Sequence, residues 1–217
     1  MGKLGILATC LATLVLSAPA FSRTLSAQDV LTVCLTTPKD PKDVLVYFYA
    51  NGWSDIAEAD RPVLRDKVAL TFLAASGQPS EATLKETEYW AELQSFAAKL
   101  LESKTPETSF VLYHVETSAI LILMPDTKAK LGLTCLLSFP AKATNSQEFH
   151  PKLPAPTAPK VFESVTDSFN SPLSRVKIIT NSVSIRQPAV DEALGIKTEI
   201  SVSFYTSIQY PTWAVSP

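Results

Sequence analysis

The chain has 217 residues, of which 46% are hydrophobic and 18% are charged, and its formal net charge at pH 7 is −2. This length allows one domain with a sizeable core, and this composition excludes a disordered protein, which combines low hydrophobicity with high net charge. Lysine and arginine form no run along the chain. We therefore expect neither nucleic acid nor an anionic membrane surface as a partner, because both bind concentrated positive charge.

The first twenty residues have the layout of a cleavable signal peptide. Lys3 supplies the positive start, residues 4–16 are mostly apolar, and Ala18-Pro19-Ala20 provides an A-x-A cleavage site. The apolar part is shorter than the roughly 20 residues that a membrane-spanning helix needs, so no membrane span is expected. We predict cleavage near Ala20 and a periplasmic or secreted mature protein that forms a single domain over residues 21–217.

The leader has a second interpretation, because residues 7–10 resemble the box that precedes the lipidated cysteine of bacterial lipoproteins. Thr9 is larger than the residue expected before that cysteine, and cleavage there would leave little apolar sequence upstream. Signal-peptide cleavage is favoured, with Cys10 as an apolar leader residue. No asparagine begins an N-glycosylation motif, which favours a bacterial periplasm over a eukaryotic secretory route.

Two cysteines, Cys34 and Cys135, remain after the leader is removed. An even number of cysteines in an exported protein favours pairing, and the alternative is two buried free thiols that behave as small hydrophobic side chains. We predict a Cys34–Cys135 disulfide. In the chain-entropy model, a loop of about a hundred residues closed in this way stabilises the fold by roughly 4–5 kcal/mol.

Helices are expected in the first half of the mature chain. Ser26 and Asp29 form a capping box before a helix that carries Cys34. A second helix is predicted from Asp40-Pro41 to the left-handed stop at Asn51-Gly52. Its apolar face comprises Val44, Leu45 and Phe48.

Two further helices are predicted before the pattern changes. One extends from Asp60 to Gly77, with Leu64, Val68 and Phe72 recurring every fourth residue, although Val68–Leu73 also fits a buried strand. The other begins near Ser80. Its apolar stripe comprises Trp90, Leu93, Phe96, Ala97, Leu100 and Leu101.

After Pro106 the apolar residues alternate, which indicates strands. Residues 110–115 and 119–124 flank a three-residue turn and predict a hairpin, and residues 131–139 form a strand with Cys135 on its core face. Residues 196–209 alternate apolar and polar side chains, which is typical of an antiparallel strand with one wet face.

The remaining segments are less regular. Residues 140–160 form a Pro-rich loop, and residues 161–169 fit either a short helix or a short strand. Residues 174–186 predict another strand, with a bend near Asn181. Together these elements predict a two-layer α+β fold, in which the N-terminal helices pack on one face of a mainly antiparallel C-terminal sheet. The disulfide would then join the first helix to the middle of the sheet.

The sequence contains no pattern of catalytic, metal-binding or cofactor-binding residues. His114 shares a strand face with apolar residues and His150 lies in the Pro-rich loop, and neither has other ligands at metal-site spacing. A structural histidine is the favoured interpretation of His114, and a solvated loop residue that of His150. A nucleophilic pair of Cys34 with His114 conflicts with the disulfide.

Acidic and aromatic residues are the other candidates for a site. Asp55, Glu58 and Asp60 fit a solvated turn better than a loose cation site, since they lack the spacing of a calcium loop. Trp53 is expected to pack against the helix that ends at Gly52. Either Tyr89, beside Trp90, or Tyr205, on the polar side of the last strand, can mark a contact patch.

These observations favour a non-catalytic binding or accessory domain in the periplasm, with an envelope protein as the candidate partner. The alternative is a hydrolase or other periplasmic enzyme that uses His114 with carboxylates brought close by folding. The Pro-rich loop at 140–160 is either a recognition segment or a spacer.

Overall fold

A computed structural model describes residues 33–34, 41–75, 87–102, 109–126, 132–140, 157, 161–170, 177–197 and 200–209. The predicted signal peptide and the predicted capping box of the first helix lie outside these ranges. So does most of the Pro-rich loop, of which Pro140 and Thr157 are described. For residues 200–209 the description covers the backbone and its register.

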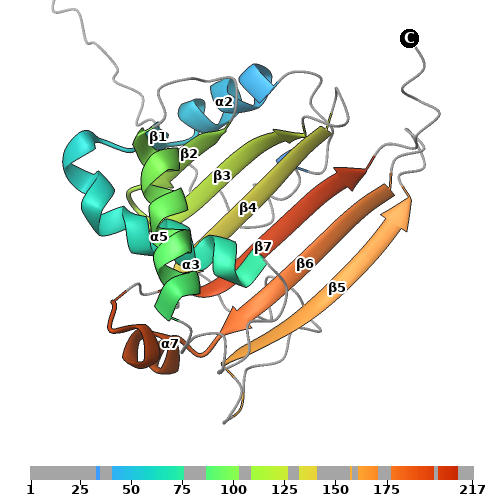
Figure 1. Ribbon diagram of the computed structural model, residues 1–217. Coiled ribbons are helices and arrows are strands. Elements are labelled where there is room, and N and C mark those ends of the chain that lie inside the picture. Colours follow the sequence, from blue (N-terminus) through green and yellow to red (C-terminus); the bar gives the residue numbers. More distant parts are fainter. Residues whose placement is uncertain are drawn as a thin grey trace, which may run out of the picture.

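Seven strands form one antiparallel sheet in the order β1-β2-β3-β4-β7-β6-β5. Figure 1 shows them side by side, with β1 and β5 at the two edges. The first four strands follow chain order, and β7 lies between β4 and β6. The strands are β1 (Trp53–Asp55), β2 (Phe110–His114), β3 (Ala119–Asp126), β4 (Gly132–Pro140), β5 (Phe162–Asn170), β6 (Lys177–Ile185) and β7 (Ile200–Gln209).

The described helices are α2 (Pro41–Ala50), the 3-10 turn η1 (Glu58–Asp60), α3 (Arg61–Ala75), α5 (Thr87–Glu102) and α7 (Gln187–Leu194). The α+β class and the packing of helices on an antiparallel sheet are therefore confirmed. Within the described ranges, no helix has the length and apolar character needed to cross a membrane.

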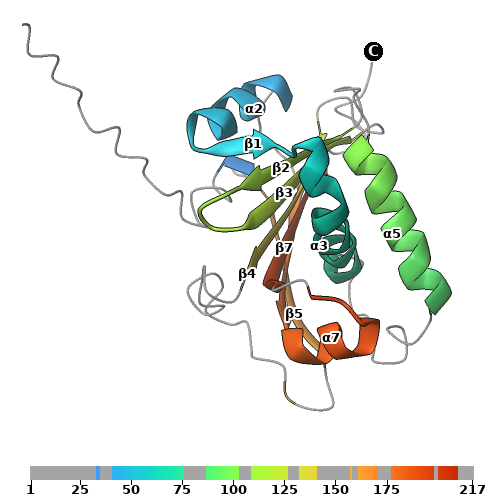
Figure 2. The same ribbon diagram turned by 90° about the vertical axis from the view of Figure 1, so that its left-hand side faces the viewer.

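The helices are divided between the two faces of the sheet (Figure 2). On one face, α3, α5 and α7 pack on a core that includes Ile120 and Leu136. On the other face, α2 packs on a core that includes Leu121 and Leu137. The middle strands β3 and β4 are thus covered on both faces. The sequence predicted two layers, whereas α2 forms a third layer at the β1 end of the sheet.

A disulfide joins the helical residue Cys34 to Cys135 on β4, the middle strand of the sheet. The two Cα atoms are 6.2 Å apart, within the range that a disulfide spans without backbone movement. Both cysteines are fully buried in the same core as Phe48 of α2. This location and burial indicate a structural bond, because a redox-active disulfide has to be accessible to a thiolate.

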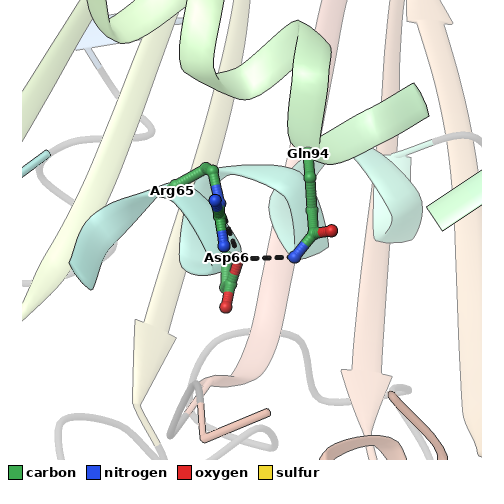
Figure 3. Close-up of polar contacts among 3 residues, drawn as sticks. All are labelled: Arg65, Asp66 and Gln94. Carbon is green, nitrogen blue, oxygen red and sulfur yellow. Dashed lines mark hydrogen bonds and ion pairs between the residues drawn. The ribbon is translucent and has the colours of Figure 1, made fainter. Parts of the chain in front are cut away.

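Polar contacts hold α3 between the sheet and α5. Asp66 on α3 accepts hydrogen bonds from Arg65 at 3.1 Å and from Gln94 of α5 at 2.8 Å (Figure 3). On the sheet side, the hydroxyl oxygens of Thr71 and Ser138 are 2.7 Å apart and buried. A buried hydroxyl needs such a partner, since an unpaired one costs about 1–3 kcal/mol.

Some local predictions differ from the structure. Phe96, expected in the core stripe of α5, is exposed and packs edge-on against Phe72. Residues 161–169, whose sequence fits either a helix or a strand, lie mostly in β5. A bend was predicted near Asn181, but the pairing of β6 with both neighbouring strands continues through this residue. Helix α7 and the short strand β1 were not predicted. Ile196, assigned to the last strand, follows α7 instead.

Candidate functional site

The ring of His114 is enclosed where β1 and β2 meet. His114 is buried at the end of β2, and Trp53 is its register partner on β1. The Trp53 and His114 ring centroids are 5.4 Å apart. The Nδ1 atom of His114 lies 2.9 Å from the hydroxyl of Thr117 and accepts the backbone N–H of Thr117 at 3.3 Å.

This geometry assigns a structural role to His114. A backbone N–H can only donate, so Nδ1 is the acceptor and the neutral ring carries its proton on Nε2. The hydrogen bond to Thr117 closes the β2–β3 hairpin turn, in which Ser118 adopts a positive φ of 54°. In the described part of the chain, the hydrogen bonds of this ring go to Thr117, and no carboxylate orients it. Such an arrangement holds a turn and does not by itself form an acid–base pair.

Trp53 packs back on α2, as predicted from its position after the helix stop. Its ring lies edge-on to Phe48, with centroids 5.7 Å apart. The indole Nε1–H is buried without a hydrogen-bond partner. Phe48, Trp53 and His114 therefore form a ring stack that joins α2 to the β1 edge of the sheet.

Gly52 is the position where this stack and the α2 stop meet. Its φ is +83°, the left-handed conformation predicted for the Asn51-Gly52 stop. A Cβ atom at Gly52 would lie 3.0 Å from the Nε2 atom of His114, so a side chain there would collide with the buried ring.

We expect Gly52→Ala to lower the free energy of unfolding by about 2–3 kcal/mol, the sum of left-handed strain and the displaced ring. Gly195, which ends α7, is the matched control, since its φ is +64° and no atom lies within 4 Å of an added Cβ. Gly195→Ala should cost about 1 kcal/mol, the strain alone. Urea unfolding of both variants measures the difference, and equal losses would contradict a contact between position 52 and His114.

A different surface of α2 has the features of an interface. Its residues Val46, Tyr47, Tyr49 and Ala50, here called the α2 outer surface, point away from the core face formed by Val44, Leu45 and Phe48. Val46 is 68% exposed, Tyr47 39% and Tyr49 42%. Residues 44–54 include no charged side chain, so from Val44 onward α2 is apolar or aromatic on its exposed side as well.

One hydrogen bond fixes part of this surface. The hydroxyl of Tyr49 donates to Oδ1 of Asp55 on β1 at 2.7 Å. Partial burial of the ring, the hydrogen bond and the negative charge of Asp55 together raise the pKa of Tyr49 to about 12, from the ordinary value of 10.0. The phenol therefore stays protonated at neutral pH, and Asp55 stays beside the aromatic surface.

The raised pKa of Tyr49 has a consequence for alkaline stability. Below pH 10.0, the pKa of Tyr49 in the unfolded chain, the hydrogen bond of Tyr49 contributes fully to the free energy of unfolding. This contribution is lost as the pH rises through the pKa of about 12 in the folded protein. In an ultraviolet titration of the folded protein, we expect the Tyr49 phenolate to form near pH 12 and this transition to disappear in Tyr49→Phe. Asp55→Asn should move that transition to lower pH, and an unchanged titration in Asp55→Asn would contradict this origin.

The acidic residues from the sequence prediction lie close along the chain to this surface. Asp55, Glu58 and Asp60 are all exposed, and so is Glu116 in the β2–β3 turn. The pairing of Trp53 with His114 brings that turn beside Gly52, at the C-terminal end of α2. In the ranges that the structure describes, no three His, Cys, Asp or Glu side chains are grouped to hold a metal ion.

The structure brings few of the other candidates together. Cys34 is bonded to Cys135 and is not available to His114 as a nucleophile. Tyr89 is half-buried and packs against the core cluster that includes Trp90. His150 and the side chain of Tyr205 lie outside the description. The α2 outer surface was missed, although the uncharged run from Val44 to Ser54 was its signal in the sequence.

Comparisons with protein-family models, curated proteins and solved structures found no match to this chain. The function is therefore inferred from the residues of the chain itself.

Proposed function

We propose that this chain is a non-catalytic binding or accessory domain that is exported to the periplasm or secreted, and that it binds a partner protein through the α2 outer surface. The observation that carries this proposal is the exposure of Val46, Tyr47 and Tyr49 on a helix whose opposite side already packs in the core. Exposed apolar and aromatic surface on a folded domain often marks a protein contact.

The compartment is inferred from two independent features. The N-terminal twenty residues have the layout of a cleavable leader. The Cys34–Cys135 bond fits an oxidising environment, because cytosolic thiols are kept reduced. Sequencing the N-terminus of the mature protein tests this part of the proposal. We expect a start at or just after Phe21, whereas an intact Met1 or a lipid on Cys10 would contradict it.

The alternative, a hydrolase that uses His114, has less support. A general base must reach the proton that it removes, and it is usually oriented by a third group. His114 is buried between Trp53 and the Thr117 turn, and its acceptor nitrogen is already engaged. A hydrolytic activity of the mature protein that is lost in a folded His114→Asn variant would favour this alternative.

The binding proposal is tested by photo-crosslinking in the exporting cell. A benzophenone amino acid replaces Tyr47 in one variant and Val63, which is 72% exposed on α3, in the control variant. We expect a discrete adduct with one envelope protein from position 47 and none from position 63. Equal labelling from both positions, or no discrete adduct from position 47, would contradict the assignment of the interface.

A further inference from the structure

We infer that the segment received by the α2 outer surface is cationic, with lysine or arginine side chains next to apolar ones. This inference rests on the proposed function and names the chemistry of its partner. Its evidence is the combination of exposed aromatic rings, an oriented carboxylate and the sign of the surrounding charges.

The charged residues that follow the α2 outer surface along the chain are acidic, whereas Lys42 and Asp43 precede it in the first turn of α2. From Val44 to Asp60 the chain contains Asp55, Glu58 and Asp60 and no lysine or arginine. All three acidic side chains are exposed, as is Glu116 in the adjoining turn. Arg61 follows at the start of α3 and is partly exposed, so its single positive charge offsets only part of this acidic group. A partner that approaches this end of the sheet therefore meets negative potential, which favours cationic groups.

The exposed groups have the chemistry that binds such cations. Aromatic faces attract an ammonium or guanidinium within about 6 Å of the ring centroid. Tyr49 donates its hydroxyl hydrogen to Asp55, so its ring orientation is fixed and the carboxylate lies beside it. A carboxylate has further acceptor sites after it accepts one hydrogen bond, and it can pair with a lysine or arginine that lies over the ring. Val46 and Ala50 then remain for apolar side chains.

The same charges argue against two other occupants. A second copy of this chain that used the same surface would bring its own Asp55, Glu58 and Asp60 to the interface, and like charges at an interface are unfavourable. An anionic membrane surface would be repelled for the same reason. The proposed occupant is therefore a cationic, partly apolar segment of another protein.

The test uses two synthetic peptides of equal length, one alternating lysine with leucine and one alternating glutamate with leucine. Fluorescence anisotropy measures binding of each peptide to the full mature protein. We expect the lysine peptide to bind at low salt and to weaken as salt is raised, because the contacts are screened over about 10 Å at 0.1 M. The glutamate peptide should not bind.

Four variants locate the binding. Tyr47→Ser and Asp55→Asn should each weaken lysine-peptide binding by about tenfold, a loss of about 1.4 kcal/mol. The matched controls are Val63→Ser on α3 and Phe96→Ser on α5, which change exposed apolar residues elsewhere and should bind like the parent protein. Circular dichroism and the unfolding midpoint of each variant show that a loss of binding is not a loss of fold.

The outcomes separate this inference from the proposed function. Equal binding of both peptides, or equal losses in all four variants, would overturn the cationic assignment. If the lysine peptide fails while the position-47 adduct still forms in cells, the interface stands and the partner is not cationic. A dimer in sedimentation that dissociates in Tyr47→Ser would show that a second copy of the chain is the occupant. Binding to phosphatidylglycerol vesicles that is lost in Tyr47→Ser would show that a membrane is the occupant. Either result would overturn the inference.

Discussion

Replacing Cys34 and Cys135 together by alanine should lower the free energy of unfolding by about 4–5 kcal/mol. The bond closes a loop with a sequence separation of 101 residues, and the chain-entropy model gives this magnitude for loops of that size. Domains of this size are stable by about 5–15 kcal/mol in total, so the variant will be close to its unfolding threshold. Urea unfolding of the oxidised parent protein and of the double variant measures the difference.

The single variants provide the control for packing. Cys34→Ala and Cys135→Ala each remove the whole cross-link, so each should cost nearly as much as the double variant, and the losses should not add. If the losses add, the effect comes from two separately packed side chains. Two reactive thiols in the unfolded, unreduced parent protein would contradict the bond itself.

The parts of the fold that local patterns predicted are those where chemistry along the chain decides the structure. The α2 helix begins at Pro41 and stops before Gly52 because proline suits the first turn and glycine the left-handed stop. Alternation likewise placed Cys135 on a core face, and the even number of cysteines after residue 20, Cys34 and Cys135, made the disulfide predictable.

The parts that were not predicted depend on what tertiary packing adds. Ser138 is a polar residue of β4, yet its side chain is buried. It is covered by α3, and Thr71 supplies a hydrogen-bond partner for its hydroxyl. The pattern of polar and apolar residues shows that position 138 is polar. It cannot show that a side chain of a neighbouring helix provides a hydrogen bond that allows burial. Helix α7 has its signals, Pro188 at the start and Gly195 in the left-handed conformation, but its eight residues are too short for a clear apolar period.

The candidate site shows the same division. The absence of charge from Val44 to Ser54 is visible in the sequence, but it fits a fully buried helix equally well. The structure shows which side of α2 is exposed to solvent, because Phe48 packs on Trp53 in the core and Val46 does not. The apolar strand face of His114 favours a structural interpretation from the sequence alone, whereas its partner Thr117 became evident only from the turn geometry.

Phe48→Ala should be the most damaging single substitution in α2, with a loss of about 3–5 kcal/mol in the free energy of unfolding. Phe48 is fully buried, and its ring supports Trp53, which in turn packs on His114. Removing the ring leaves a cavity between α2 and the sheet, and the remaining residues can fill it only in part. The α2 outer surface should then lose its fixed position.

The neighbouring aromatic residue is the matched control, because Tyr47→Ala removes a ring of similar size from the exposed side of the same helix. Tyr47 makes an edge contact with Phe48 but is 39% exposed, so its removal should cost less than about 1 kcal/mol. If the core face of α2 holds the helix on the sheet, Phe48→Ala affects stability and Tyr47→Ala affects binding. Phe48→Ala should lower the unfolding midpoint strongly, whereas Tyr47→Ala should keep the midpoint near that of the parent and lose the position-47 contact with the partner. Similar midpoints for the two variants would mean that the buried stack of Phe48, Trp53 and His114 does not anchor the helix.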